Sequence, residues 1–180
     1  MVRDKLPNLL RLTLSSLIVI IVRAREIVNN LAKQRCMSTD DFNWISNLRY
    51  YFDKKSETVK VSMVMSELTY ANEFLGNTGR LVITPLTERC YRTLMSALTL
   101  NLGGAPEGPA GTGKTETTKD LAKAVAVYCR TFNCGEGLNA KFMSRFFKGL
   151  ASGGSWSCFD EFNRIELEVL SVVAQQILEI

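Results

Sequence analysis

The 180-residue sequence predicts an α/β fold, in which a three-layer core surrounds a parallel sheet and follows a mainly helical segment that contains a β-hairpin. Two observations support this prediction. Beyond about residue 80, stretches with helical spacing of apolar residues alternate with short apolar runs typical of buried strands. Before residue 80, helical spacing dominates, and one stretch alternates apolar and polar side chains as a half-buried strand does.

The composition is that of an ordinary globular protein, with 46% hydrophobic and 22% charged residues. The chain has no histidine, which excludes histidine-based catalytic triads and most zinc sites within it. Its five cysteines include no C-x-x-C pair, so we expect free thiols in a reducing compartment. The net charge of +4 is too mild to indicate nucleic-acid binding, and no basic run or interleaved aromatic patch indicates it either.

The N-terminal part, residues 4–35, has apolar residues at helical spacing and predicts one long helix or two stacked helices. Residues 12–22 within it are strongly apolar but much shorter than the roughly 20 residues that span a membrane. A secretory signal is the alternative, but no small-residue cleavage site follows. We therefore expect a buried helix and no membrane association.

A β-hairpin is expected next, because residues 59–65 alternate in polarity and residues 68–70 can return as their partner. The aromatic residues of the preceding stretch, 42–52, are expected to pack rather than to bind a ligand. Residues 76–79 form a turn cluster, after which the rhythm changes. We therefore place a domain boundary there, with one domain over residues 1–79 and another over residues 80–180.

The second domain is predicted to alternate helices and strands. Helices are expected over residues 87–102, 116–128 and 139–150 and from about 165, and strands over 130–134 and up to Asp160. A very short strand is expected within residues 103–108, although Pro106 cannot donate to a ladder. Because only about three strands are expected, we interpret the chain as an incomplete portion of a larger protein.

One motif predicts a phosphate-binding loop. Residues 108–115 fit G-x-x-x-x-G-K-[ST], in which glycines let several backbone N–H groups point at one spot. The positive end of the following helix, which begins near Glu116, faces the same spot. The sequence therefore predicts a binding site for ATP and Mg²⁺, with Lys114 on the β- and γ-phosphates and Thr115 on the metal. The nucleotide-binding residues are Gly108, Pro109, Ala110, Gly111, Thr112, Gly113, Lys114, Thr115 and Glu116.

A second motif predicts the acidic side of the same site. The mostly apolar residues 156–159 precede Asp160 and Glu161, and ligands bind at the carboxyl ends of parallel strands. Asp160 is therefore expected to hold Mg²⁺, and Glu161 to orient or deprotonate the attacking water. The alternative is that Asp160 and Glu161 are a surface acidic pair that caps the next helix. The phosphate loop upstream argues against this alternative.

Taken with residues 81–87 (LVITPLT), 116–123 (ETTKDLAK), 132–134 (FNC) and 158–165 (CFDEFNRI), these motifs resemble those of dynein heavy chains, microtubule motors of the AAA+ class. The resemblance covers nearly the whole chain: the end of the linker and the first AAA+ module. Residues 41–52 are similar to the closing segment of the linker, and residues 104–109 and 117–124 look more like axonemal than cytoplasmic dyneins.

The resemblance implies further site residues. Val82, Ile83 and Thr84 match the strip that lies against adenine, and Asn133 is a candidate for the polar residue that switches the catalytic glutamate. Asn133 can equally cap a turn. Together with Lys114 and Glu161, it completes the predicted catalytic set.

The resemblance also implies a function, which is an ATPase that couples hydrolysis to linker movement in microtubule-based ciliary motility. The implied partners are ATP, neighbouring AAA+ modules, microtubules, and dynein intermediate and light chains, the last three through regions beyond these residues. The implied location is the cytoplasm and cytoskeleton, in the axoneme of a cilium or flagellum. Two alternatives remain: a non-motor AAA+ remodelling ATPase, and a nucleotide-binding structural module that does not cycle. We expect these 180 residues alone to bind ATP weakly and to hydrolyse it barely.

Overall fold

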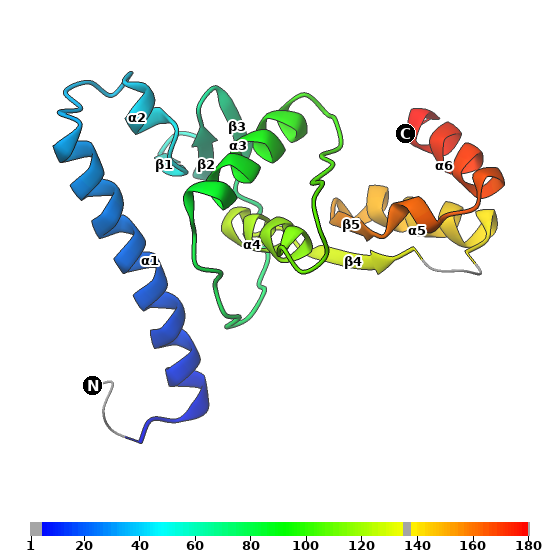
Figure 1. The fold of residues 1–180 in the computed structure, drawn as a ribbon, viewed down its shortest axis with the longest axis horizontal. Coiled ribbons are helices and arrows are strands. Elements are labelled where there is room, and N and C mark those ends of the chain that lie inside the picture. The colour runs from blue at the N-terminus through cyan, green and yellow to red at the C-terminus, as the bar shows by residue number, and fades with distance from the viewer. Residues whose placement is uncertain (1–4, 135–137, 180) are drawn as a thin grey trace. The chain divides into compact units, whose positions relative to one another are not determined.

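The computed structural model describes residues 5–134 and 138–179 and divides into two compact units, Met1–Ala126 and Val127–Ile180 (Figure 1). Each unit combines helices with a small sheet, as the predicted mixture of helix and strand requires. The boundary between the units lies at residues 126 and 127, whereas the domain boundary predicted from sequence lies near residue 80. The predicted boundary concerns the modules of a larger protein and stays a prediction.

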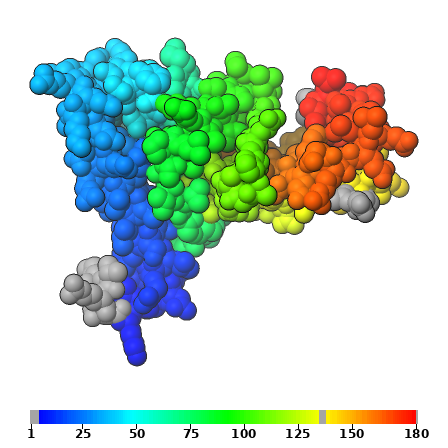
Figure 2. Space-filling model, in the orientation of Figure 1, coloured from blue at the N-terminus to red at the C-terminus, as the bar shows by residue number. Residues whose placement is uncertain are grey.

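The first unit begins with one continuous helix, α1 (Asn8–Lys33), none of whose residues is buried. The expectation that its apolar run is buried is therefore wrong for this chain. The helix contacts the rest of its unit where Ser16 donates to the carbonyl of Thr78 and where Arg23 pairs with Glu88. Its N-terminal turns, dark blue in Figure 2, protrude from the unit. In the described parts of the chain, no helix is both long enough and apolar enough to cross a membrane.

A short helix, α2 (Phe42–Ile45), leads into an antiparallel sheet of three strands, β1 (Arg49–Asp53), β2 (Thr58–Met63) and β3 (Ser66–Thr69). The sheet contains the hairpin expected near residues 59–70, with Val61 opposite Leu68. Strand β1 extends the hairpin, with Tyr50 opposite Val61. The sequence analysis did not predict β1 as a strand.

Two helices complete the first unit, α3 (Pro85–Thr99) and α4 (Lys114–Val125). Helix α3 begins with a capping box, in which the side chains of Thr84 and Thr87 each bond the other residue's backbone N–H. It packs against both β3 and α4. The core residues of the unit come from β2, α3 and α4 and include Val61, Met63, Tyr91, Met95, Leu121 and Val125. The very short strand expected within residues 103–108 does not form, and that stretch connects α3 to α4 without regular structure.

The C-terminal end of α4 is held by the segment around the small sheet. The last carbonyl groups of a helix have no partner within the helix. Here the backbone N–H groups of Ala71 and Glu73 donate to the carbonyls of Val125 and Ala126, at 3.0 and 3.1 Å. The Tyr50 hydroxyl donates to the carbonyl of Ala124 at 2.9 Å. The chain that leaves the hairpin therefore caps the helix that begins at the predicted phosphate loop.

The second unit is built on two parallel strands, β4 (Cys129–Asn133) and β5 (Trp156–Asp160). Helix α5 (Ala140–Gly153) connects them, and a 3₁₀ turn (Phe162–Arg164) and α6 (Leu167–Glu179) follow. Helices α5 and α6 share a core of Met143, Phe147 and Val173, on which Phe132 of β4 and Phe159 of β5 pack. The parallel pairing predicted for these strands is confirmed within this unit.

Candidate functional site

The predicted phosphate loop is a glycine-rich turn that runs directly into a helix. Gly111 and Gly113 have φ angles of 76° and 81°, and Gly108 has a φ of 151°. Residues with a Cβ rarely adopt such angles, so this path of the backbone requires glycine. Gly113 is the N-cap of α4, whose first residue is Lys114. The loop therefore lies at the positive end of the helix macrodipole.

The side chain of Lys114 folds over the loop. Its ammonium group donates to the carbonyls of Gly108 and Pro109, at 2.8 and 2.7 Å, and the Thr112 hydroxyl also donates to Pro109, at 2.9 Å. The loop, including Ala110, is exposed, whereas Thr115 in the first helical turn is half-buried. Glu116 forms an ion pair with Lys119 along the helix. A full positive charge, a hydroxyl and a helix N-terminus therefore converge on one exposed loop.

The strip predicted to contact adenine is an extended segment before α3. Val82 is 68% exposed, Ile83 is half-buried, and Thr84 is the N-cap of α3. An exposed apolar side chain such as Val82 can accept the flat face of a ligand. The strip belongs to the same unit as the phosphate loop.

A buried carboxylate, which the sequence analysis missed, links this strip to α4. Asp120 lies on α4 and its side chain is only 2% exposed. It accepts two hydrogen bonds from Arg80 (3.0 and 3.1 Å), one from the backbone N–H of Leu81 (3.0 Å) and one from the Tyr91 hydroxyl (2.6 Å). We call Arg80, Leu81, Tyr91 and Asp120 the Asp120 cluster.

The electrostatics of the cluster follow from burial and pairing. Burial alone would raise the pKa of Asp120, but its hydrogen bonds from Arg80, Tyr91 and Leu81 outweigh that effect and hold the pKa below its ordinary value. Burial opposes the charge on Arg80, but the bond to Asp120 leaves its pKa raised. Burial and the neighbouring carboxylate both raise the pKa of Tyr91. The cluster therefore carries a fully ionised pair at neutral pH.

One signal in the sequence could have revealed the cluster. Asp120 falls in the apolar stripe of α4, between Thr117 and the buried residues Leu121 and Ala124. A carboxylate at such a position is almost never buried without a partner.

Two of the predicted polar site residues lie at the carboxyl ends of the two parallel strands. Asn133 ends β4, Asp160 ends β5, and the two are direct partners in the register. The backbone N–H of Cys134 donates to the carbonyl of Asp160 at 2.9 Å. Burial and the charge of Asp160 raise the pKa of the Cys134 thiol. The structure thus brings Asn133 and Asp160 together at one end of the sheet.

Glu161 occupies an unusual backbone position just beyond β5. Its φ and ψ of 54° and 40° lie in the left-handed region, which residues with a Cβ seldom adopt. Its N–H donates to Asp160 Oδ1 at 3.1 Å, and its carboxylate lies 2.8 Å from Arg164 Nε. The chain therefore turns sharply at Glu161 and keeps its side chain exposed.

The predicted site residues thus fall into two groups, each described within its own unit. Residues 82–84 and 108–116 lie in the first unit, and Asn133, Asp160 and Glu161 lie in the second. The Thr115 hydroxyl and the Asp160 carboxylate are hard oxygen donors of the kind that Mg²⁺ prefers. Within residues 5–134 and 138–179, no group of three His, Cys, Asp or Glu side chains forms a metal cage. Such a cage is not needed, since Mg²⁺ usually keeps waters and phosphate oxygens as ligands.

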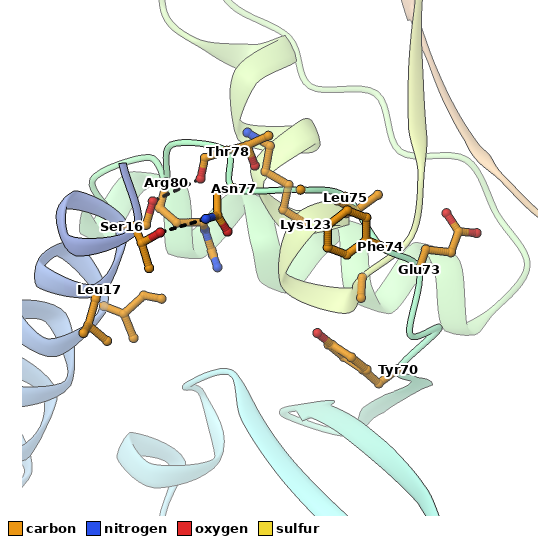
Figure 3. Close-up of a pocket in the computed structure, with 14 residues that line it drawn as sticks. Ser16, Leu17, Tyr70, Glu73, Phe74, Leu75, Asn77, Thr78, Arg80 and Lys123 are labelled. Carbon is orange, nitrogen blue, oxygen red and sulfur yellow. Dashed lines mark hydrogen bonds between the residues drawn. The ribbon is translucent and has the colours of Figure 1, made fainter. Parts of the chain in front are cut away.

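The first unit also has a cavity away from the predicted nucleotide-binding residues. A cavity of about 360 Å³ opens between α1, residues 70–80 and the end of α4 (Figure 3). None of the residues predicted to bind nucleotide lines it. Arg80 and Lys123 lie at its wall, where Lys123 donates to the carbonyl of Gly79 at 3.1 Å. These contacts fix the residues just before the strip at 82–84.

Comparisons with known proteins agree with the motifs. Residues 70–180 match the family model described as the hydrolytic ATP binding site of dynein motor region. Over all 180 residues the chain is 64% identical to dynein axonemal heavy chain 3 of Mus musculus and of Homo sapiens, and covers 4% of each. It is 61% identical over 178 residues, 99% of its length, to dynein axonemal heavy chain 12 of Homo sapiens, and covers 6% of that protein. The chain therefore spans a small part of the relatives it matches.

Proposed function

Because the chain belongs to the dynein heavy chain family and matches its axonemal members, we propose that it supplies the ATP-hydrolysing site of a microtubule motor. The single observation that carries this proposal is the phosphate loop. Its positive-φ glycines lead into the N-terminus of α4, with Lys114 as the first helical residue. This is the arrangement that a triphosphate requires of a P-loop NTPase.

Each predicted residue then has a chemical task. The loop from Gly108 to Thr115, with the N-terminus of α4 at Glu116, binds the phosphates, and Lys114 exchanges its two carbonyl acceptors for phosphate oxygens. Residues 82–84 contact the adenine. Glu161 orients the attacking water and takes its proton. Asn133 switches Glu161 between a position that faces this water and one that does not. Thr115 and Asp160 bind Mg²⁺, which neutralises the charge that develops on the phosphates.

The wider function follows the family. Residues 1–79 form the end of a linker, and residues 80–180 belong to an AAA+ module with a three-layer core of the P-loop type. Hydrolysis changes the contacts around the γ-phosphate, and the linker moves in response. Neighbouring AAA+ modules complete the site, and other regions of the heavy chain bind microtubules and the intermediate and light chains. The proposed location is the cytoplasm and cytoskeleton, in the axoneme of a cilium or flagellum.

Substitution of Glu161 by Gln in the full-length heavy chain tests this proposal. The change keeps the shape of the side chain but removes the proton acceptor. We expect the microtubule-stimulated turnover to fall by about 10²–10⁴ while ATP binding persists. Glu168→Gln is the matched control, because Glu168 is an exposed carboxylate in the same unit, and we expect its turnover to stay unchanged.

The possible outcomes separate the alternatives. Unchanged turnover in the Glu161→Gln protein would remove Glu161 as the base. An unsubstituted heavy chain that binds ATP without turnover would identify a structural nucleotide-binding module. Turnover that microtubules do not stimulate would favour a remodelling ATPase over a motor.

A further inference from the structure

We propose that Asp120 is a positioning residue for the purine base of the nucleotide, because it fixes the strip at residues 82–84 to the helix that carries the phosphate loop. This inference rests on the proposed function and adds a determinant of base binding to it. The observation behind it is the Asp120 cluster, whose contacts all lie within the first unit.

The cluster joins three segments at one carboxylate. Asp120 belongs to α4, six positions beyond Lys114, so it lies about 9 Å along the helix from the phosphate loop. Its Oδ1 accepts from Arg80 and from the backbone N–H of Leu81, and its Oδ2 accepts from Arg80 and from Tyr91 of α3. A rigid helix therefore sets the distance between the phosphate loop and the residue just before the strip.

The strip is held at both ends. At one end, the backbone N–H of Leu81 donates to Asp120 at 3.0 Å. At the other end, Thr84 is fixed by the capping box of α3, and Tyr91 ties α3 to the same carboxylate. Only Val82 and Ile83 lie between these two anchors. Their position relative to α4 is therefore set by Asp120 at both ends.

The chemistry of the cluster suits a fixed support. A bidentate pair between a guanidinium and a carboxylate defines both distance and orientation. Four hydrogen bonds satisfy the buried carboxylate, so its replacement by an amide would remove the counter-charge of Arg80 and one of the two acceptor oxygens. The hydrogen bonds to the Asp120 carboxylate come from Arg80, Leu81 and Tyr91, which lie outside the phosphate loop. Its loss should therefore affect the base more than the phosphates.

Two ligands separate these effects in the full-length heavy chain, namely ATP and inorganic tripolyphosphate, which has the phosphates but no base. Hydrogen exchange of residues 108–116 reports occupancy of the phosphate loop, and that of residues 81–84 reports occupancy of the strip. In the Asp120→Asn protein, we expect the ATP midpoint for protection of residues 108–116 to rise about tenfold. We expect the tripolyphosphate midpoint to change less than about twofold.

Matched variants complete the design. Tyr91→Phe keeps the ring in the core and removes one hydrogen bond, so it should raise the ATP midpoint by about threefold. If the Asp120→Asn protein does not accumulate, the ATP and tripolyphosphate midpoints of the Tyr91→Phe protein test the inference in its place. Glu67→Gln removes an exposed carboxylate of the same unit, which pairs with Lys60 at the surface, and should move neither midpoint.

Equal rises in both midpoints would overturn the inference, since they would indicate a general loss of structure. So would an ATP midpoint that stays unchanged. If neither ligand protects residues 108–116 in the unsubstituted chain, the proposed function itself fails. That failure is visible without any variant and is therefore distinct from a failure of the role of Asp120.

Discussion

Glu161 combines an exposed carboxylate with a left-handed backbone at the carboxyl end of β5. A residue with a Cβ in this conformation costs about 1–2 kcal/mol. The ion pair with Arg164 offers little compensation, because its side chains are 43% and 61% exposed. Strain of this kind persists where the surrounding structure imposes it, and it clusters at functional sites. Here it occurs at the residue immediately after Asp160, where β5 ends.

A pair of variants at this position measures the strain. Glu161→Gly and Glu161→Ala both remove the carboxylate, but only glycine adopts the left-handed region freely. We expect the Gly protein to resist local opening of residues 156–165 better than the Ala protein, by about 1 kcal/mol. Native-state hydrogen exchange of the β5 amides measures this difference. Equal protection in the two proteins would show that Glu161 is not strained.

At the scale of elements, α4 is the connecting part of the first unit. Its N-terminus carries the predicted phosphate loop, its middle carries Asp120, and its last carbonyls accept bonds from Tyr50, Ala71 and Glu73. The small sheet and the loop are therefore joined through one helix.

Removal of the Tyr50 hydroxyl should loosen this connection. The Tyr50→Phe substitution keeps the ring and deletes the bond to the carbonyl of Ala124, which contributes about 1 kcal/mol. We expect faster hydrogen exchange at the amides of Ala71 and Glu73, which donate to the next two carbonyls. Tyr51→Phe is the control, because the Tyr51 hydroxyl is exposed and bonds only Arg49 in the described contacts. If both variants exchange alike, the Tyr50 hydroxyl does not hold the end of α4.

The elements that the sequence predicted well are those with a local signal. The helices beyond residue 80 and the two parallel strands follow from apolar periodicity, and the hairpin near residues 59–70 follows from alternation. The sequence analysis missed strand β1 because its residues, RYYFD, do not alternate between apolar and polar side chains. The apolar run of α1 was expected to be buried, but burial depends on what packs against a helix, which periodicity cannot specify. The position of Asp120 in the apolar stripe of α4 indicates that it needs a partner, but local patterns cannot identify Arg80, which lies 40 positions away in the sequence.

The candidate site was partly predictable for the same reason. The loop motif encodes its own backbone path, and the structure has positive φ at its glycines. Strand ends are likewise local, and Asn133 and Asp160 meet in the register of the parallel pair. The contacts of the predicted nucleotide-binding residues with ATP and Mg²⁺ stay predictions.

At the scale of the whole molecule, the chain corresponds to 4% to 6% of the heavy chains that it resembles. Many apolar side chains of α1 are exposed in it, among them Leu9, Ile21 and Val28, at 66%, 57% and 63%. In related NTPases, a neighbouring part of the assembly supplies an arginine finger that contributes about 10³–10⁵ in rate.

We therefore expect the 180-residue chain on its own to hydrolyse ATP at least about 10³-fold more slowly than the full-length heavy chain. Both rates can be measured per mole of protein, at saturating ATP and with microtubules present. The Glu161→Gln form of the short chain gives the background. Turnover of the short chain close to that of the heavy chain would mean that these residues contain the whole catalytic apparatus.

Helix α4 has 12 residues and so measures about 18 Å from end to end. Hydrogen-bonded helices barely shorten or stretch, so α4 moves as a rigid body of constant length. A shift of even half an ångström at Lys114 would arrive almost undiminished at Val125 and Ala126, where the backbone of Ala71 and Glu73 is bonded directly. The segment that follows the hairpin would then move together with the phosphate loop, because hydrogen bonds join it directly to the end of α4.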